Sequence, residues 1–175
     1  MKPVVFTSVA LIVLTAVSGC SSAQAPVVEP ACRAEPLPPP HTEVAPCSAP
    51  AVLQAAVTML YRLDPVAEVD ARSTFKAARP LIRATYVTDA RIGESLWAPI
   101  TPEVWQDWVD SRVPLRTEVS LTGDTPVPDT ATSSSRVFSV ALTPVDRTPI
   151  EFWVSARATR AGAERAWLVA EMRVL

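Results

Sequence analysis

The amino-acid sequence predicts an α+β domain with helices first and an antiparallel sheet after them. Between Pro50 and Trp108, apolar residues recur three and four positions apart, the spacing of helices that bury one face. After Ser111 the spacing changes to strict alternation, the period of strands with one buried face. Helices followed by strands favour N-terminal helices packed on a curved antiparallel sheet of four strands or more.

The first two helices are expected in the region that follows the proline-rich segment. Pro50 suits a first helical turn, and the Asp64-Pro65 pair ends that helix. A second helix is expected over residues 71–83, with Pro80 kinking it or ending it early. The inward-facing residues of the two helices are Val52, Leu53, Ala56, Met59, Leu60, Leu63, Phe75, Ala78, Leu81 and Ile82.

A third, short helix is expected to begin after Thr101. This residue type is a favoured N-cap, Pro102 fits the first turn, and Glu103 places a negative charge at the positive end of the helix dipole. One face of the helix carries Val104, Trp105, Trp108 and Val109.

Four alternating segments predict the strands. Because the connections between the last three are short, an antiparallel meander is expected, preceded by a long loop over residues 123–135. The residues expected to face the core are Val113, Leu115, Thr117, Val119, Leu121, Phe138, Val140, Leu142, Ile150, Phe152, Val154, Ala156, Leu168, Ala170, Met172 and Val174.

The N-terminus has the features of an export signal over residues 1–19. Lys2 precedes an apolar run over residues 4–17, which is too short to span a bilayer. The following Val17-Ser18-Gly19-Cys20 resembles the lipobox of bacterial lipoproteins. The resemblance implies diacylglyceryl (and often palmitate) on Cys20, cleavage before it, and a lipid anchor at the extracytoplasmic face of a cell membrane. An ordinary secreted protein is the alternative.

Residues 20–49 are expected to form a proline-rich linker ahead of a globular domain over residues 50–175. With Cys20 lipidated, Cys32 and Cys47 remain as an even pair in an oxidising compartment, which predicts a disulfide. A zinc site is the competing explanation, but His41 is the only histidine, and two thiolates with one imidazole make a poor structural site. No metal or cofactor is expected.

The charge of the chain argues against nucleic acid as a direct partner. Without Lys2, 15 basic residues stand against 18 acidic ones, and no basic block exists to hold a nucleic-acid backbone. Arginine outnumbers lysine 14 to 2, and alanine, valine and proline are abundant. This composition indicates a GC-rich genome, such as that of an actinobacterium.

Several stretches of the domain resemble a group of actinobacterial exported proteins. They are Asp64-Pro65, Asp70 with Ala77-Ala78-Arg79-Pro80-Leu81, the Trp105 and Trp108 pair, and residues 126–129 before Arg136. That group has the nuclear transport factor 2-like fold, a cone of helices against a bent sheet, and is linked to conjugation or type IV secretion. Its tethered members usually carry a transmembrane helix where this chain has a lipobox.

No catalytic constellation is expected. Ser73 and Lys76 match the S-x-x-K pattern of penicillin-binding proteins, but the companion motifs are missing and both residues suit an exposed helix face. Enzymes of the cone-shaped fold use histidine with a carboxylate, and His41 lies in the expected linker. The carboxylates considered as bases are Asp70, Glu94, Asp107 and Glu118. The protein is therefore interpreted as a non-enzyme.

Five tryptophans provide the candidate binding residues. Trp97, Trp105 and Trp108 either complete the core or line a pocket for an apolar small molecule, which would make the protein a carrier or sensor of a lipid or other small ligand. This function is the alternative interpretation.

The other two tryptophans alternate with core residues, so they are expected on the opposite sheet face. Trp153 and Trp167 would lie there beside Arg157 and Arg173, a combination typical of interface anchors; indoles covered by arginine stems are the other interpretation. The leading hypothesis is an anchored adaptor that docks envelope partner proteins, as in a conjugation-type secretion complex.

Overall fold

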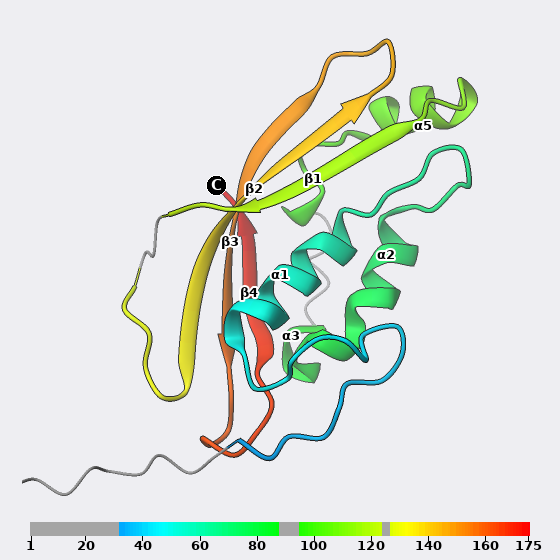
Figure 1. Cartoon of the computed structure of the whole chain (residues 1–175). Helices are drawn as coiled ribbons and strands as arrows, with labels where there is room; N and C mark the ends of the chain where they lie inside the picture. Colours follow the sequence, from blue (N-terminus) through cyan, green and yellow to red (C-terminus); the bar gives the residue numbers. More distant parts are fainter. Residues whose placement is uncertain (1–31, 88–94, 124–126) are drawn as a thin grey trace, which may run out of the picture.

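Four antiparallel strands form a single sheet in the computed structural model, which describes residues 32–87, 95–123 and 127–175. The strands are β1 (Leu115–Leu121), β2 (Ser133–Pro144), β3 (Ile150–Thr159) and β4 (Leu168–Val174), and they pair in sequence order. Figure 1 shows the long strands β2 and β3 bending midway, with the helices on one side. The expected α+β class and antiparallel meander are confirmed.

The inner face of the sheet is formed by alternate residues of β2 and β3. Their side chains are buried because successive residues of a strand point to opposite faces, and the helices cover only one of these faces. The buried set is Phe138, Val140, Leu142, Phe152, Val154, Ala156 and Ala158. Strand β2 begins at Ser133, so Ser133 to Ser135, which were expected in the preceding loop, belong to the sheet.

Helix α1 (Ala49–Leu60) packs directly on this inner face. Ser48 caps it by accepting a hydrogen bond from the Ala51 amide, with Pro50 in the first turn. Its buried residues lie three and four apart, as expected, and include Val52, Leu53, Ala56, Val57 and Leu60.

The remaining helices are short. Helix α2 (Ala71–Ala78) is capped by Asp70 and passes into a 3-10 turn, η1 (Arg79–Leu81), so Pro80 ends it early. Helix α3 (Ala84–Val87) follows. Helix α5 (Pro102–Asp110) begins after Thr101, whose side chain accepts from the Val104 amide.

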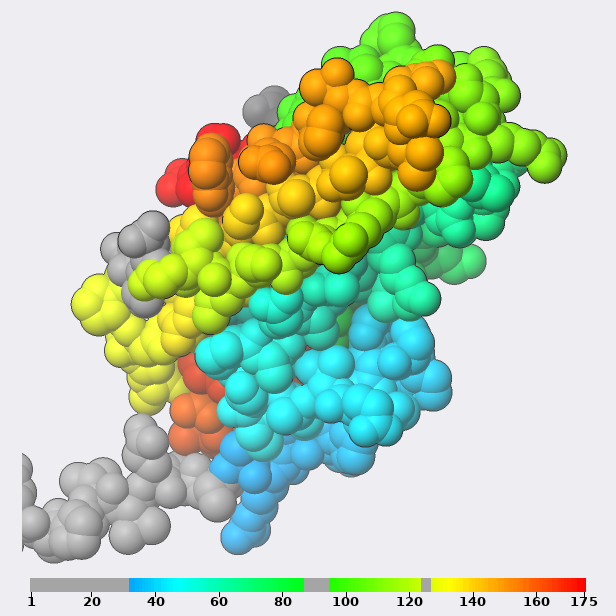
Figure 2. Space-filling view, turned by 45° about the horizontal axis from the view of Figure 1, so that its top comes forward, coloured from blue at the N-terminus to red at the C-terminus, as the bar shows by residue number. Residues whose placement is uncertain are grey.

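The expected boundary at Pro50 is corrected by the packing of residues 32–49, here called the strap. Leu37 and His41 are buried, and Figure 2 shows the strap in blue lying against helix α1 in cyan. Proline favours extended backbone, but here the extended segment is held by the domain. Within the described chain, the packed unit therefore includes residues 32–49.

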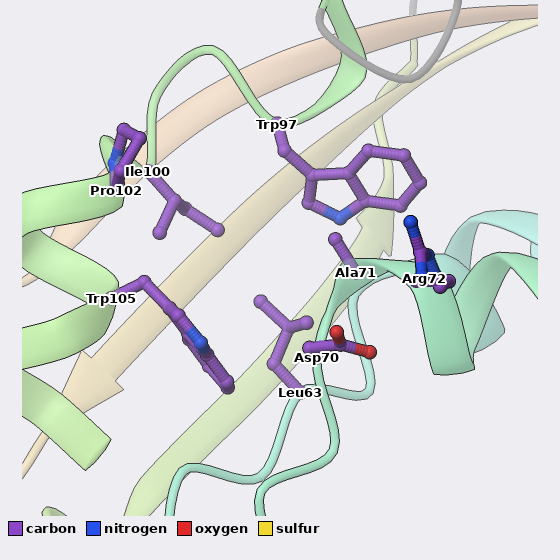
Figure 3. Close-up of a pocket in the computed structure, with 8 residues that line it drawn as sticks. All are labelled: Leu63, Asp70, Ala71, Arg72, Trp97, Ile100, Pro102 and Trp105. Atoms are coloured by element: carbon purple, nitrogen blue, oxygen red, sulfur yellow. The ribbon is translucent and has the colours of Figure 1, made fainter.

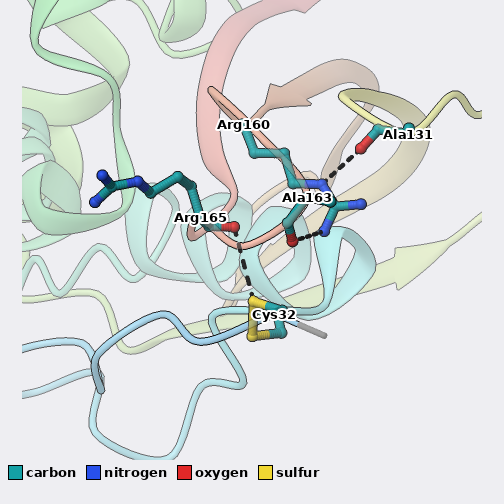
Figure 4. Close-up of a disulfide and its surroundings, with 6 residues drawn as sticks. Cys32, Ala131, Arg160, Ala163 and Arg165 are labelled. Atoms are coloured by element: carbon teal, nitrogen blue, oxygen red, sulfur yellow. Dashed lines mark hydrogen bonds between the residues drawn. A yellow bond between two sulfur atoms is a disulfide. The ribbon is translucent and has the colours of Figure 1, made fainter. Parts of the chain in front are cut away.

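Polar contacts fix the strap at both ends. The disulfide between Cys32 and Cys47 is present, with a Cα–Cα distance of 5.8 Å. His41 Nε2 donates to the Ala77 carbonyl at 2.8 Å, and the Trp167 amide donates to the Pro46 carbonyl at 2.9 Å. Figure 4 shows Cys32 beside the Arg165 carbonyl, 3.7 Å from its Sγ. The strap thus connects helix α2 to the β3–β4 turn.

Candidate binding surfaces

The outer sheet face exposes a single large aromatic side chain. Trp153 of β3 is 54% exposed, and it lies opposite Ser139 of β2. The amide of Leu175, itself 61% exposed, donates to the Trp153 carbonyl at 2.9 Å. About half of the Trp153 side chain is therefore open to contact by another molecule.

Two arginines, Arg157 and Arg173, share the outer sheet face with Trp153. Arg157 pairs with Glu171 across the strands at 2.9 Å, and both side chains are about half exposed. Arg173, opposite Ser155, makes no hydrogen bond or ion pair within the described part of the chain. A hollow of about 190 Å³ lies here. Its lining residues are Val127, Ser135, Ser155, Arg157, Glu171 and Arg173.

The expectation that Trp167 shares this face is wrong. Trp167 is only 6% exposed, and the Arg160 guanidinium carbon lies 4.6 Å from the centre of its ring. The cause is a register shift between Arg157 and Ala158, which pair with Glu171 and Val169 respectively. The extra residue of a bulge reverses the facing of the residues before it.

Because of this bulge, the expected facing of the first residues of β4 is also wrong. Val169, rather than Leu168 and Ala170, enters the core, whereas Met172 on the far side of the bulge is buried as expected. Arg160 is fixed above Trp167 by donating to the carbonyls of Ala131 at 2.6 Å and Ala163 at 2.7 Å (Figure 4). Of the two interpretations of Trp167, interface anchor or indole covered by an arginine, the structure contains the second.

The other three tryptophans separate into a pocket pair and a core residue. Trp97 and Trp105 are half-buried and line a pocket of about 350 Å³, the tryptophan pocket, between the start of α2 and α5 (Figure 3). Trp108 is 2% exposed and belongs to the core. The pocket is lined by Leu63, Asp70, Ala71, Arg72, Trp97, Ile100, Pro102 and Trp105.

Aromatic neighbours fix the orientation of Trp97. Its ring lies 6.5 Å from that of Tyr61 and 6.1 Å from that of Phe75, between centroids. Tyr61 is fully buried and donates its hydroxyl to the Leu96 carbonyl at 2.7 Å. Burial raises the pKa of Tyr61 above its ordinary value, so its hydroxyl remains a donor.

One donor of the tryptophan pocket has no acceptor. The Trp97 Nε1 atom is buried and makes no hydrogen bond with any residue that the structure describes. Figure 3 shows this nitrogen turned inward, toward Ala71 and the centre of the pocket. A buried N–H without an acceptor costs about 1–3 kcal/mol, so an acceptor placed there would be stabilising.

Asp70 and Ser73 form a local pair at the edge of this pocket. Asp70 Oδ1 accepts from the Ser73 hydroxyl at 2.7 Å and from the Ser73 amide at 2.8 Å. These hydrogen bonds, the hydroxyl's first, lower the pKa of Asp70. The Ser73 proton is thus directed at a helix-capping carboxylate, and Lys76 makes no hydrogen bond to this serine.

The other carboxylates considered as bases lie apart from one another. Asp107 pairs with Arg147 at 3.0 Å, which lowers the pKa of Asp107, and Glu118 pairs with Arg116 on the exposed side of β1. Glu94 lies outside the described residues. The structure brings none of Asp70, Asp107 and Glu118 together.

Two functional features gave only weak sequence signals. No periodic pattern around His41 predicts that it is buried. The predicted disulfide is an indirect signal, because a disulfide within a free linker would have little structure to stabilise. The unpaired Trp97 donor depends on its neighbours in space, which the sequence does not show.

Cys20 and the lipobox lie outside the described residues. Among the residues that the structure describes, no helix has the length and apolar character needed to span a bilayer.

Comparison with known proteins gives no relative. No family model matches the chain, and neither a curated protein nor a solved structure matches it. The outer sheet face and the tryptophan pocket are therefore interpreted from their own chemistry.

Proposed function

We propose that this protein is a lipid-anchored, extracytoplasmic adaptor that docks a partner protein of a cell-envelope assembly without catalysing a reaction. The assembly would be of the conjugation-type secretion class, and the domain a nuclear transport factor 2-like cone. The helices on one side of a bent meander support that fold assignment. The lipobox resemblance at Cys20 supports the anchor.

The observation that carries the docking proposal is the exposure of Trp153 beside Arg173. A half-exposed indole costs little conformational entropy when it is covered, and tryptophan with arginine is enriched among the residues that dominate binding energy. The hollow beside Arg173 suits a carboxylate, because a guanidinium without a partner can form a charge-assisted pair. The expected partner therefore presents an apolar side chain next to an acidic one.

Capture of partners from membranes of the native host tests this surface. A Trp153→Ala/Arg173→Ala variant is expected to lose partners that the wild type retains. The matched control is Val66→Ala/Arg62→Ala, which removes one exposed apolar side chain and one exposed arginine away from the outer face. Equal partner recovery by both variants would exclude this face as the docking site.

The anchor has a separate test. The intact mass of the native product is expected to show a chain that begins at Cys20 and carries diacylglyceryl, and Cys20→Ser should release the protein from membranes. An unmodified sulfur would refute the anchor. A fluorescent penicillin that labelled Ser73 would refute the non-enzymatic part of the proposal.

A further inference from the structure

The tryptophan pocket has the size and lining of a ligand site. Its volume of about 350 Å³ lies within the range of about 300–1,000 Å³ that is usual for small-molecule pockets. It lies among the helices on the inner side of the sheet, so its use does not depend on docking at the outer sheet face. Most of its lining is apolar: Leu63, Ala71, Trp97, Ile100, Pro102 and Trp105.

Contacts within the chain hold the Trp97 indole and the backbone of Trp105 without a ligand. Trp97 contacts the rings of Tyr61 and Phe75, and its carbonyl accepts from the Ile100 amide at 2.8 Å. Trp105 lies in the first turn of α5, where its amide donates to the Thr101 carbonyl at 3.0 Å. A preformed pocket avoids the entropy that a flexible one loses on binding.

The polar groups of the pocket limit the kind of ligand. Asp70 and Arg72 stand at one edge with opposite charges (Figure 3), so the edge favours neither a cation nor an anion. The inward Trp97 N–H is a donor without an acceptor in the described structure. A ligand that leaves this N–H unpaired gains less binding free energy than a ligand that supplies an acceptor oxygen.

We infer that the tryptophan pocket binds a small, uncharged, apolar molecule whose carbonyl oxygen accepts a hydrogen bond from Trp97 Nε1. The apolar body of the ligand would lie between Trp97 and Trp105, as the lining indicates. The carbonyl would satisfy the pocket's buried N–H donor, which is unpaired in the described structure.

Two fluorescent probes test the inference on the purified protein. Prodan is an uncharged naphthyl ketone, and 2-dimethylaminonaphthalene is a related probe without the carbonyl. Saturable binding with blue-shifted emission is expected for prodan. Trp97→Phe keeps an aromatic ring and removes the donor, so it should weaken prodan binding about five- to tenfold and leave the carbonyl-free probe unchanged.

Three controls make the result decisive. Ala71→Leu narrows the pocket and should abolish binding of both probes, whereas Trp153→Phe on the outer sheet face should change neither. In the wild type, the Trp97 indole proton resonance should move downfield when prodan binds, a readout that does not require any variant to fold. Absence of saturable prodan binding, or an indole resonance that does not move, would overturn the inference while leaving the adaptor proposal intact.

Discussion

The inner and outer faces of the sheet come from the same strands but carry opposite kinds of side chain. Inward residues of β3 such as Phe152 and Val154 are buried under helix α1, whereas Trp153 between them is 54% exposed. The inner face is closed by contacts within the chain, and nothing in the described structure covers the outer one. Apolar area on the inner face stabilises the fold, so the indole on the outer face is available for another role.

The largest expected effect comes from truncating the inner face. Phe138 is fully buried, and Phe138→Ala should lower the free energy of unfolding by about 3–5 kcal/mol because it leaves a cavity. Trp153→Ala, which removes a larger side chain, should change it by only about 0.5 kcal/mol. Urea denaturation of both variants measures the contrast, and similar losses would show that the two faces contribute alike.

The next effect concerns the strap, which belongs to the covered side. The disulfide links residues that are 15 apart, and a loop of that length is worth about 3 kcal/mol through constraint of the unfolded chain. Cys32→Ser/Cys47→Ser should lose about that amount in urea denaturation. The wild type treated with a reductant serves as the control and should match the variant; a stable, reductant-insensitive wild type would contradict the assignment.

A pH-dependent effect is expected where β2 leaves its preceding loop. Arg136 donates to both oxygens of Asp129, at 2.7 and 2.6 Å, and these bonds lower the pKa of Asp129 from 3.8 to about 2. The folded state therefore favours the carboxylate, so this contribution is complete above pH 4 and is lost as the pH falls toward 2.

Asp129→Asn should remove this dependence. The difference in unfolding free energy between wild type and variant, measured by urea denaturation from pH 6 to pH 2, should shrink as the pH falls. A difference that stays constant over this range would show that the carboxylate charge is not what stabilises the loop.

The smallest effect is expected on the outer face. The Arg157–Glu171 pair is about half exposed, and exposed pairs of this kind contribute about 0.2–1 kcal/mol. A double-mutant cycle with Arg157→Ala and Glu171→Ala measures that coupling. A coupling well above this range would mean that the outer face stabilises the fold and is not reserved for docking.

Much of the fold could be predicted because the period of apolar residues is a local property. Alternation placed Phe138, Val140 and Val154 on the inner face, and Thr101 with Pro102 marked the start of α5. The facing of Trp167 could not be predicted in this way. A bulge adds one residue to a strand without changing the composition around it, so the pattern gives no sign of the shift.

The packing of the strap could not be predicted for a different reason. Its prolines indicate extended backbone, but they do not show whether that backbone is free or packed. Leu37 and His41 are isolated buried residues, and the partners that fix the segment, Ala77 and Trp167, come much later in the chain.

The tryptophan pocket had a clearer sequence signal, since two of the three candidate tryptophans line it and Trp108 completes the core.

The attachment of Cys32 beside the β3–β4 turn has a consequence for orientation. With a lipid on Cys20, as proposed, twelve residues separate the bilayer from this fixed point, a reach of roughly 40 Å when fully extended. The tether would therefore join the domain at the end that holds the disulfide, and the β2–β3 turn lies at the opposite end (Figure 1). Trp153 on the outer sheet face would then be free to meet a partner within that distance of the membrane.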